Sequence, residues 1–353
     1  MQITDIQFEK VSFSFEQPMK VAFAEIKDIE TLLVKIDTDE GLSGFGEAAP
    51  LPFVTGDNLD SAWAVGRELR KALLGCDPAA VGGIHRRMDS LYNGCGAIKC
   101  AIDMACYDIA AKAAGMPLYR YLGGESGHVH SDVTIGIDTP DAMAAKALEW
   151  IEKGFTILKI KLGEDIETDL ARMQAVRKAA GPSIALRIDA NQGWTVKDSL
   201  RVIPELEKLN VGLIEQPVAA WNYEGLREIR QAVRLPIAAD ESCHTPVDAA
   251  RLASMQAVDF INIKLMKCGG IYNAIKINAV AESFGVSCMI GCMGESALAN
   301  VAGMHVAAAL DNIKEVDLDA VYILSDKKAH GGFEHKGGRA VLTDTPGIGV
   351  TID

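Results

Sequence analysis

Six charged residues lie inside or at the end of short apolar runs that recur about every 25 residues. Two lysines, Lys159 and Lys161, belong to the run 157–162, and the alternation of a strand would point both side chains to the same face. Later runs carry the other four charges, which are Asp189, Glu215, Asp240 and Lys264. Like charges on one buried face are costly unless carboxylates, a metal ion or an anionic ligand lie opposite them. The pattern therefore predicts one site in which lysines face carboxylates.

This set of residues suits proton transfer at a carbon next to a carboxylate. Asp189, Glu215 and Asp240, at the ends of three successive apolar runs, provide the oxygen ligands that a hard divalent cation such as Mg²⁺ requires. The cation would stabilise the negative charge that develops on the substrate when its α-proton is removed. Lys161 and Lys264 would remove a proton from one face of the carbon and return one to the other, with their basicity lowered by burial and by the cation. The expected result is inversion, a racemisation or an epimerisation.

A purely structural explanation exists for each residue taken alone. An aspartate at a strand end often caps a helix or joins an ion pair, and Lys159 could pair with Glu164 or Asp165. Charged residues at five matching strand ends are harder to explain in this way. We interpret the set as functional.

The elements that would position these residues alternate between strand and helix from residue 132 onward. Strands are expected at 132–137, 157–162, 184–189, 211–215, 236–240, 260–265, 286–291 and 315–319. Helices are expected at 140–153, 165–180, 195–209, 222–233, 246–254, 271–284 and 295–309. Eight such strands predict a closed parallel (β/α)7β TIM-like barrel, in which active sites form at the carboxyl ends of the strands and the second strand lies opposite the sixth.

The first part of the chain does not share this period and predicts an α+β domain. Its expected strands and helices are 2–13, 29–37, 42–47, 58–75 and 97–114. The segments 18–26 and 49–57 are expected to be loops and candidate lids. The predicted division is a capping domain at 1–125, a barrel at 126–320 and a C-terminal segment at 321–353 that returns to the capping domain.

Composition indicates a soluble, cytoplasmic protein with a large core. Hydrophobic residues make up 49% of the 353 residues, no apolar run approaches the ~20 residues needed to span a bilayer, and the N-terminus lacks a signal pattern. The formal net charge of −13 argues against nucleic acid or an anionic membrane as a partner. The eight cysteines show no C-x-x-C spacing and are expected to be reduced core residues.

The chain resembles the enolase superfamily, and within it the muconate-lactonizing-enzyme subgroup. The motifs that carry the resemblance are Lys159-Ile160-Lys161, Asp189-Ala190-Asn191-Gln192, Glu215-Gln216-Pro217, Asp240-Glu241-Ser242 and Ile263-Lys264-Leu265-Met266-Lys267-Cys268-Gly269-Gly270. The resemblance implies that Asp189, Glu215 and Asp240 bind Mg²⁺ and that Lys161 and Lys264 form the acid/base pair. It also implies that Lys159 neutralises the enediolate or holds the substrate carboxylate, and that the first domain caps the barrel mouth.

A second acidic motif lies on the expected eighth strand. In Val316-Asp317-Leu318-Asp319 the two carboxylates are two residues apart, so both are expected to face the barrel interior, opposite the metal. The pair resembles the motif with which dipeptide epimerases hold the α-ammonium of a dipeptide whose C-terminal carboxylate lies on Mg²⁺. A solvated turn is the alternative. The resemblance also suggests Thr134, Cys292 and Gly294 as substrate contacts, although Thr134 and Cys292 could equally be packing residues.

The resemblance thus implies a Mg²⁺-dependent dipeptide epimerase that inverts the α-carbon of the C-terminal residue by a two-lysine proton transfer. Epimerases that take Ala-Glu usually have an arginine in the capping domain, where this chain has Ala24. Phe23, Phe53 and Gly294 suggest room for an apolar side chain, whereas Glu25 could favour a basic one. An uncharged or hydrophobic dipeptide is favoured.

Three alternatives stay open at this point. The first is specificity for L-Ala-D/L-Glu. The second is o-succinylbenzoate synthase or muconate cycloisomerase activity, against which Asp317 and Asp319 argue because two carboxylates would repel a dianionic substrate. The third is a barrel that binds an amino-acid-like ligand without turnover, which would need neither lysine. Similar proteins commonly associate, so a homo-oligomer is expected.

Overall fold

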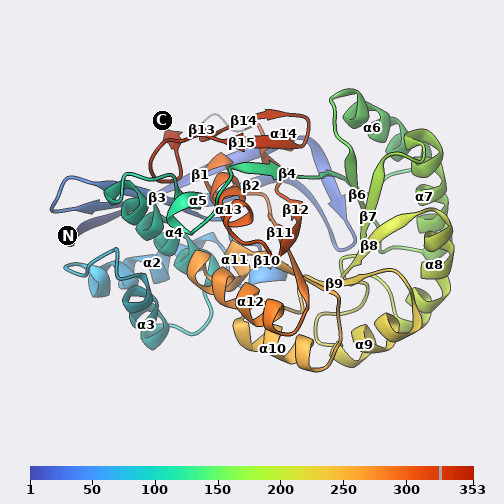
Figure 1. Ribbon diagram of the computed structural model, residues 1–353, viewed down its shortest axis with the longest axis horizontal. Helices are drawn as coiled ribbons and strands as arrows, with labels where there is room; N and C mark the ends of the chain where they lie inside the picture. Colours follow the sequence, from blue (N-terminus) through green and yellow to red (C-terminus); the bar gives the residue numbers. More distant parts are fainter. Residues whose placement is uncertain (326–327) are drawn as a thin grey trace.

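The structure is a computed structural model that describes residues 1–325 and 328–353 (Figure 1). Eight parallel strands form its largest sheet, in the same order as in the chain. They are β5 (Val133–Ile135), β6 (Ile157–Lys161), β7 (Ala185–Asp189), β8 (Val211–Glu215), β9 (Ile237–Ala239), β10 (Phe260–Lys264), β11 (Ser287–Gly291) and β12 (Ile313–Asp317). A hydrogen bond from Asp132 N to Val316 O, 3.1 Å long, joins the two ends of the ladder. The predicted TIM-like barrel is confirmed.

Seven helices connect these strands, and Figure 1 shows α6 to α10 following one another around the outside of the sheet. Their bounds are α6 (Pro140–Glu152), α7 (Ile166–Ala180), α8 (Val196–Lys208), α9 (Tyr223–Ala232), α10 (Pro246–Ser254), α12 (Ile271–Ser283) and α13 (Ala297–Ala309). Capping boxes fix the starts of α8 and α10, where Thr195 pairs with Asp198 and Thr245 with Asp248. Two single-turn helices follow strands directly, α11 (Leu265–Cys268) after β10 and α14 (Ala320–Ile323) after β12.

The N-terminal part combines an antiparallel sheet with five helices. The sheet contains β1 (Ile3–Val21), β2 (Ala24–Thr38) and β3 (Ser43–Ala48), and the helices are α1 (Pro52–Thr55), α2 (Leu59–Leu73), α3 (Val81–Leu91), α4 (Gly96–Ala113) and α5 (Leu118–Tyr121). Helix α4 is buried along most of its length. It approaches β3 closely because Gly46 has no side chain, and a Cβ there would overlap the carbonyl oxygen of Ala101.

The prediction that 18–26 is a loop was wrong. Strands β1 and β2 continue through this segment as a hairpin, in which Met19 pairs with Ile26 and Val21 with Ala24. The ladder is interrupted between Ser14 and Met19, in the stretch that contains Pro18, and it resumes at Met19. Proline cannot donate to a ladder, but an irregularity of this kind accommodates it. The second expected loop, 49–57, contains the single turn of α1. The hairpin reaches from the N-terminal sheet towards the barrel strands (Figure 1).

The C-terminal segment forms two small sheets. Strand β13 (Ala329–Gly331) pairs with β16 (Val350–Ile352), and β14 (Phe333–Lys336) and β15 (Arg339–Leu342) extend β4 (His128–His130). Contacts with the N-terminal part include a bridge between Phe15 and Leu324 and a hydrogen bond from Ile348 N to Asp108 Oδ1 of 2.8 Å. The division of the chain at residues 125 and 320 stays a prediction.

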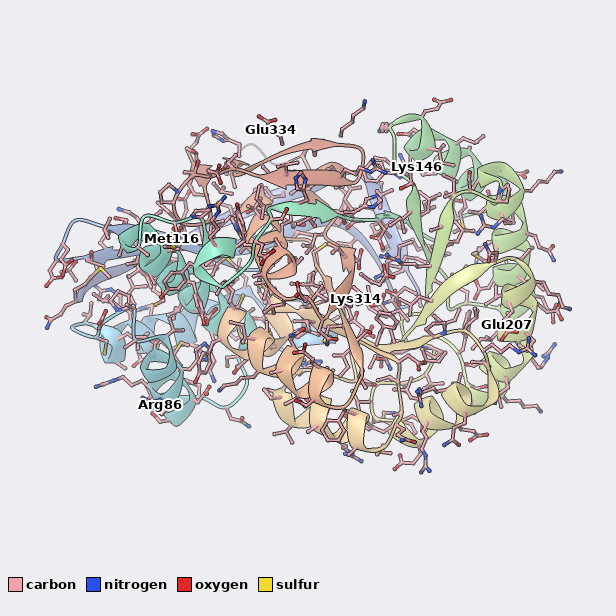
Figure 2. The ribbon with its side chains drawn as sticks, in the orientation of Figure 1. Arg86, Met116, Lys146, Glu207, Lys314 and Glu334 are labelled. Carbon is pink, nitrogen blue, oxygen red and sulfur yellow. The ribbon has the colours of Figure 1, made fainter. Side chains whose placement is uncertain are left out.

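Charged side chains lie at the surface, and the cysteines are not joined by disulfide bonds. Figure 2 shows many charged side chains projecting outward, such as Glu207 on α8. All eight cysteines are free, as predicted, and six of them are buried. Within residues 1–325 and 328–353, no helix is both long and apolar enough to cross a membrane.

Candidate functional site

Strand register brings the predicted residues to one end of the barrel. Lys161 on β6 pairs with Asp189 on β7, which pairs with Glu215 on β8. Lys264 and Asp317 take the corresponding positions on β10 and β12, on either side of β11. All five are the last residues of their strands. The site therefore follows from the equal spacing of the apolar runs.

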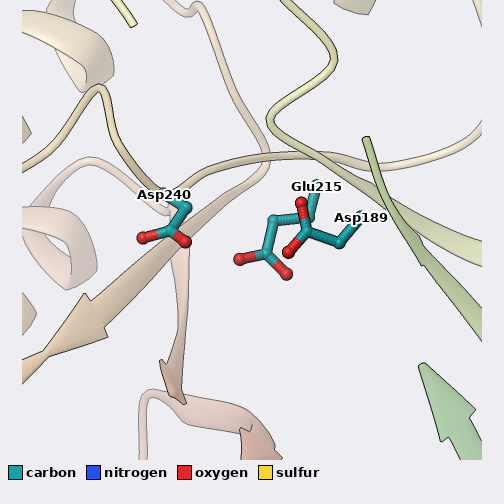
Figure 3. Close-up of side chains that lie close together, drawn as sticks. All are labelled: Asp189, Glu215 and Asp240. Atoms are coloured by element: carbon teal, nitrogen blue, oxygen red, sulfur yellow. The ribbon is translucent and has the colours of Figure 1, made fainter. Parts of the chain in front are cut away.

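Three carboxylates form the centre of the site. Oxygen atoms of Asp189, Glu215 and Asp240 all lie within 4.8 Å of one another, and the three residues are buried. Figure 3 shows the groups of Asp189 and Glu215 next to each other, with Asp240 beside them. Asn262 Nδ2 donates a 2.6 Å hydrogen bond to Glu215 Oε1. Three converging carboxylates are the donor set that a hard divalent cation prefers, so the residues fit Mg²⁺.

Two lysines contact this cluster from different strands. Lys161 Nζ lies 2.6 Å from Asp189 Oδ2, and Lys264 Nζ lies 2.7 Å from Asp240 Oδ2. In the barrel order β6 and β10 are the second and sixth strands, which lie on opposite sides. The two amines therefore border the cluster from opposite sides.

Lys159 lies deeper than the other two lysines. Its Nζ contacts Asp317 Oδ2 at 2.6 Å, Glu215 Oε2 at 2.8 Å and Asp189 Oδ2 at 3.1 Å, and the residue is 1% exposed. It does not belong to the described wall of the pocket at this site. Its expected contact with a substrate carboxylate stays a prediction, while its ion pairs show that it neutralises buried carboxylates.

Sequence reasoning gave Lys267 no role, although it is part of the site. Its Nζ donates to Asp240 Oδ1 at 2.5 Å and also to the backbone oxygen of Asp240, and the side chain is buried. Lys267 lies in α11, one helical turn after Lys264. A lysine three residues beyond a strand-end lysine, in an otherwise apolar turn, was the signal that could have identified it.

Two further polar residues of the pocket wall were quoted in the motifs without a role. Asn191 Nδ2 lies 3.3 Å from Glu241 Oε1. Asn191 lies two residues after Asp189, and Glu241 directly follows Asp240. The strand ends that place these carboxylates therefore also place Asn191 and Glu241. Burial, followed by the charge of Asp240, raises the pKa of Glu241 to about 8.

Burial raises the pKa values of the clustered carboxylates, whereas the neighbouring lysine charges lower them. Burial raises the pKa of Asp189, but the charges of Lys161 and Lys159 outweigh it and hold the pKa at about 2. Burial and the neighbouring Asp189 raise the pKa of Glu215 to about 7. Burial lowers the pKa of Lys264, but the charges of Asp240, Glu215 and Asp317 together outweigh it and raise the pKa of this lysine. The lowering expected from burial together with the cation stays a prediction. The cluster is thus stabilised by its lysines.

The pocket above these residues has a polar floor and an apolar roof. Lys161, Lys264, Asp317 and Asp319 all border it, as do Thr134 and Cys292. The roof comes from the hairpin and the segment 49–57, with the side chains Phe23, Leu51 and Val54 among others. Both expected lid segments therefore do lie over the site.

Asp317 and Asp319 reach the pocket from different elements. The eighth strand was expected to continue to residue 319, but β12 ends at Asp317, and Asp319 is the N-cap of α14, with a helical backbone (φ −103°, ψ −6°). Both residues are 3% exposed. Asp319 Oδ2 accepts from Thr134 N at 2.6 Å, and Oδ1 accepts from Cys292 Sγ at 3.4 Å. Burial, then the charge of Asp317, raises the pKa of Asp319.

Gly294 is placed differently from the other predicted substrate contacts. It is not among the described residues of the pocket wall, and a Cβ at this position would overlap the side chain of Ile29 on β2. A side chain here would require that of Ile29 to move, so the glycine allows close packing against the N-terminal sheet. Phe23 and Phe53 contact each other, with ring centroids 5.3 Å apart.

Comparison with known proteins covers both parts of the chain. Residues 3–123 match the N-terminal domain of mandelate racemase / muconate lactonizing enzyme, and residues 142–353 match the enolase C-terminal domain-like family. The L-Ala-D/L-Glu epimerase of Clostridium acetobutylicum is 40% identical over 353 residues, which cover 99% of each chain. The hydrophobic dipeptide epimerase of Enterococcus faecalis is also 40% identical, over 99% of this chain and 100% of that protein.

Solved structures give the same result. The structure of the dipeptide epimerase from Enterococcus faecalis V583, complexed with Mg and the dipeptide L-Leu-L-Tyr, superimposes with a TM-score of 0.98 at 40% identity. The match covers 99% of this chain and 100% of that one. The chain therefore belongs to the mandelate racemase / muconate lactonizing enzyme family of the enolase superfamily, and it is an isomerase.

Proposed function

We propose that this protein is a Mg²⁺-dependent dipeptide epimerase that inverts the α-carbon of the C-terminal residue. One observation carries the proposal: a single pocket is bordered by Lys161, Lys264, Asp317 and Asp319, and it opens onto Asp240 of the carboxylate cluster. The two relatives described above, an L-Ala-D/L-Glu epimerase and a hydrophobic dipeptide epimerase, support it.

In this proposal Asp189, Glu215 and Asp240 hold Mg²⁺. The bound cation supplies electrostatic stabilisation of the negative charge that develops at the substrate carboxylate. Lys159 and Lys267 hold the three carboxylates in place, because their amines contact carboxylate oxygens at 2.5 to 3.1 Å. The positions of the carboxylates are thus set by the protein itself.

Asp317 and Asp319 bind the α-ammonium of the dipeptide. Both carboxylates are buried at the pocket wall, and a buried carboxylate favours a cationic partner. Lys159 already compensates Asp317 in part, whereas within residues 1–325 and 328–353 the hydrogen bonds to Asp319 come from neutral donors, Thr134 N and Cys292 Sγ. The ammonium at one end and the carboxylate at the other fix the α-carbon of the second residue between the two lysines.

Lys161 and Lys264 exchange the proton. One amine, in its neutral form, removes the α-proton, and the other, as an ammonium, donates a proton to the opposite face. The roles are reversed for the other epimer. The opposite placement of β6 and β10 is what makes inversion the expected outcome, because two lysines on one face could only return the proton to the face it left.

The proposed substrates carry an uncharged or hydrophobic C-terminal residue. The pocket roof contains Phe23, Leu51 and Val54, and Ala24 stands where the Ala-Glu enzymes usually have an arginine. The nearby Lys20 is already paired with Glu164 at 2.8 Å. Overall identity does not decide the preference, since the L-Ala-D/L-Glu relative and the hydrophobic dipeptide relative are equally similar at 40%.

Deuterium exchange tests this proposal. A mixed library of L,L-dipeptides is incubated in heavy water with Mg²⁺ or with EDTA, and incorporation at each α-carbon is measured by mass spectrometry. We expect Mg²⁺-dependent incorporation at the C-terminal residue, strongest for apolar side chains. Exchange confined to glutamate at that position would contradict the specificity, and no exchange in any dipeptide would contradict the function.

A further inference from the structure

A second cavity adjoins the catalytic pocket and has no role in the proposed proton transfer. It has a volume of about 390 Å³ and lies between the end of β1, strand β5 and helix α6. Four residues border both spaces: Phe15, Met19, Thr134 and Ile323. The two spaces therefore meet at the wall that carries Thr134.

The inner wall of the cavity is apolar, and its charged residues, Lys20, Asp138, Lys146 and Glu149, lie at the rim. Met143 and Trp150 of α6 are almost fully buried beside it, together with Ile135 of β5. At its rim Lys146 contacts Glu149 at 2.8 Å, and Lys20 contacts Glu164 at 2.8 Å. The inner wall favours an uncharged, apolar group, because a charged group placed against Ile135, Met143 and Trp150 would lose its hydration without gaining a charged partner there.

The wall between the hairpin and the barrel is held by the backbone. Ile137 N donates a 2.8 Å hydrogen bond to Lys20 O. Gly136 permits this approach, since a Cβ there would lie 2.9 Å from Met19 Sδ. The cavity is thus formed before a ligand binds, which lowers the entropic cost of filling it.

We propose that this cavity binds the side chain of the N-terminal residue of the dipeptide and selects large apolar residues there. The inference rests on the proposed function, in which the α-ammonium lies at Asp317 and Asp319. Thr134 donates its N–H to Asp319 and also borders the cavity, so the α-carbon next to the ammonium lies at the cavity entrance.

Relative volume supports the same assignment. The volume of the catalytic pocket is about 70 Å³, and that of the cavity is about 390 Å³. Room for a long side chain on the N-terminal residue therefore lies in the cavity, away from the two lysines. Lys161 and Lys264 border only the smaller space.

Kinetics with a graded substrate series test the inference. The C-terminal residue is kept as L-Leu, and the N-terminal residue is varied through Gly, L-Ala, L-Val, L-Leu, L-Met and L-Phe. We expect kcat/KM to rise by roughly tenfold or more from L-Ala to L-Leu, L-Met or L-Phe, since each buried methylene group contributes to discrimination. The gain is expected mainly in KM, because the cavity contacts no reacting atom.

Two phenylalanine variants on one helix localise the effect. Ala142 borders the cavity, whereas Ala144 lies two residues further on α6 and is not among the residues of its wall. Ala142→Phe fills the cavity and is expected to lower the ratio of kcat/KM for L-Leu-L-Leu over L-Ala-L-Leu at least tenfold. Ala144→Phe is expected to leave this ratio at the wild-type value.

The outcomes separate this inference from the function on which it rests. Exchange that is equally fast for Gly, L-Ala and the large residues would overturn the cavity assignment and leave the epimerase proposal standing. If Ala142→Phe leaves the ratio of kcat/KM for L-Leu-L-Leu over L-Ala-L-Leu unchanged, the cavity assignment is likewise overturned and the epimerase proposal stands. Absence of exchange for every dipeptide of the series in the wild-type protein would overturn both.

Discussion

At the scale of single residues, the site is a compensated cluster of buried charges. Lys159 is 1% exposed and is surrounded by Asp189, Glu215 and Asp317 at 3.1 Å or less. A buried ion is tolerable only if it is paired, and removal of one partner leaves the others uncompensated. The stability of the barrel mouth therefore depends on residues that also belong to the candidate site.

Replacing Lys159 by alanine should destabilise the protein strongly. We expect a loss of about 3–5 kcal/mol in the free energy of unfolding, because three carboxylates lose their counter-charge. The measurement is urea denaturation with EDTA present. Lys208→Ala is the matched control: its amine contacts Glu205 at 2.7 Å on the surface, with 68% of the side chain exposed, and such pairs contribute at most about 1 kcal/mol. Equal losses in the two variants would contradict the account.

Replacing Asp319 by asparagine should weaken substrate binding. A charge-assisted hydrogen bond contributes about 1.5–3 kcal/mol, so we expect KM for a free dipeptide to rise roughly tenfold to a hundredfold. Steady-state epimerisation assays measure it, with the exposed Asp311→Asn as the control. A normal KM in Asp319→Asn would show that the ammonium binds elsewhere.

At the scale of elements, the sequence predicted the barrel well because its signal is local and repeated. Helix 97–114 was placed within one residue of α4, and the strand that ends at Asp189 was placed within one residue of β7. Lys161, Asp189, Glu215 and Lys264 could be identified because each ends an apolar run. A period of this kind depends only on neighbours along the chain.

Other features depend on contacts between distant segments and left no periodic signal. The hairpin through 18–26 was missed because the ladder between β1 and β2 is interrupted between Ser14 and Met19, and its pairing resumes beyond Pro18. The bend after Asp317 was missed because Leu318 continues the strand alternation, although the chain turns there into α14. Lys267 was missed because its partner, Asp240, follows β9, which is distant from α11 along the chain.

The junction between β3 and α13 should make stability depend on pH. Glu47 of β3 is fully buried, and its carboxylate accepts hydrogen bonds from Ser296 N (3.0 and 3.1 Å) and Ser296 Oγ (2.5 Å) at the start of α13. Burial raises its pKa from 4.5 to about 7, despite these hydrogen bonds, and the charge of Glu295 adds to this. Between these two pH values the folded chain binds a proton that the unfolded chain has released. Folding is therefore favoured at the low end, and stability falls as the pH rises through this window.

Glu47→Gln should remove that part of the pH dependence. The two pKa values differ by about 2.5, which at 1.36 kcal/mol per pH unit corresponds to on the order of 3 kcal/mol between pH 4.5 and pH 8. Denaturant unfolding at several pH values measures it, with the exposed Glu125→Gln as the control. An unchanged slope in Glu47→Gln would show that this carboxylate is ionised in the folded state.

At the scale of the whole molecule, the site is completed by both parts of the chain. The barrel supplies the lysines and carboxylates, while Phe23, Leu51 and Val54 come from the N-terminal part, more than 100 residues away in sequence. The cavity beside α6 is likewise bordered by the hairpin. Substrate preference is therefore expected to follow the N-terminal part.

Mg²⁺ should stabilise the whole fold, because the three clustered carboxylates lie at the ends of three strands, with Asp240 directly after β9. A ligand at a hundred times its Kd adds about 2.7 kcal/mol to the stability of the folded state. We expect thermal unfolding to shift upward on addition of Mg²⁺ and to return with EDTA. Asp240→Asn should reduce the Mg²⁺-induced shift in Tm, whatever its effect on the starting Tm. A shift of the same size in this variant would place the ion elsewhere.

The central claim is that Lys161 and Lys264 act on opposite faces of one carbon, and stereochemically resolved exchange tests it most directly. Lys161→Arg and Lys264→Arg keep the positive charge but lose an amine that can release its proton at neutral pH. Each is incubated in heavy water with both epimers of one dipeptide, and α-deuterium is followed by NMR. The account predicts that epimerisation falls by at least about a hundredfold in both variants, and that each variant retains exchange for a different epimer. Wild-type epimerisation in either variant, or retained exchange of the same epimer in both, would contradict it.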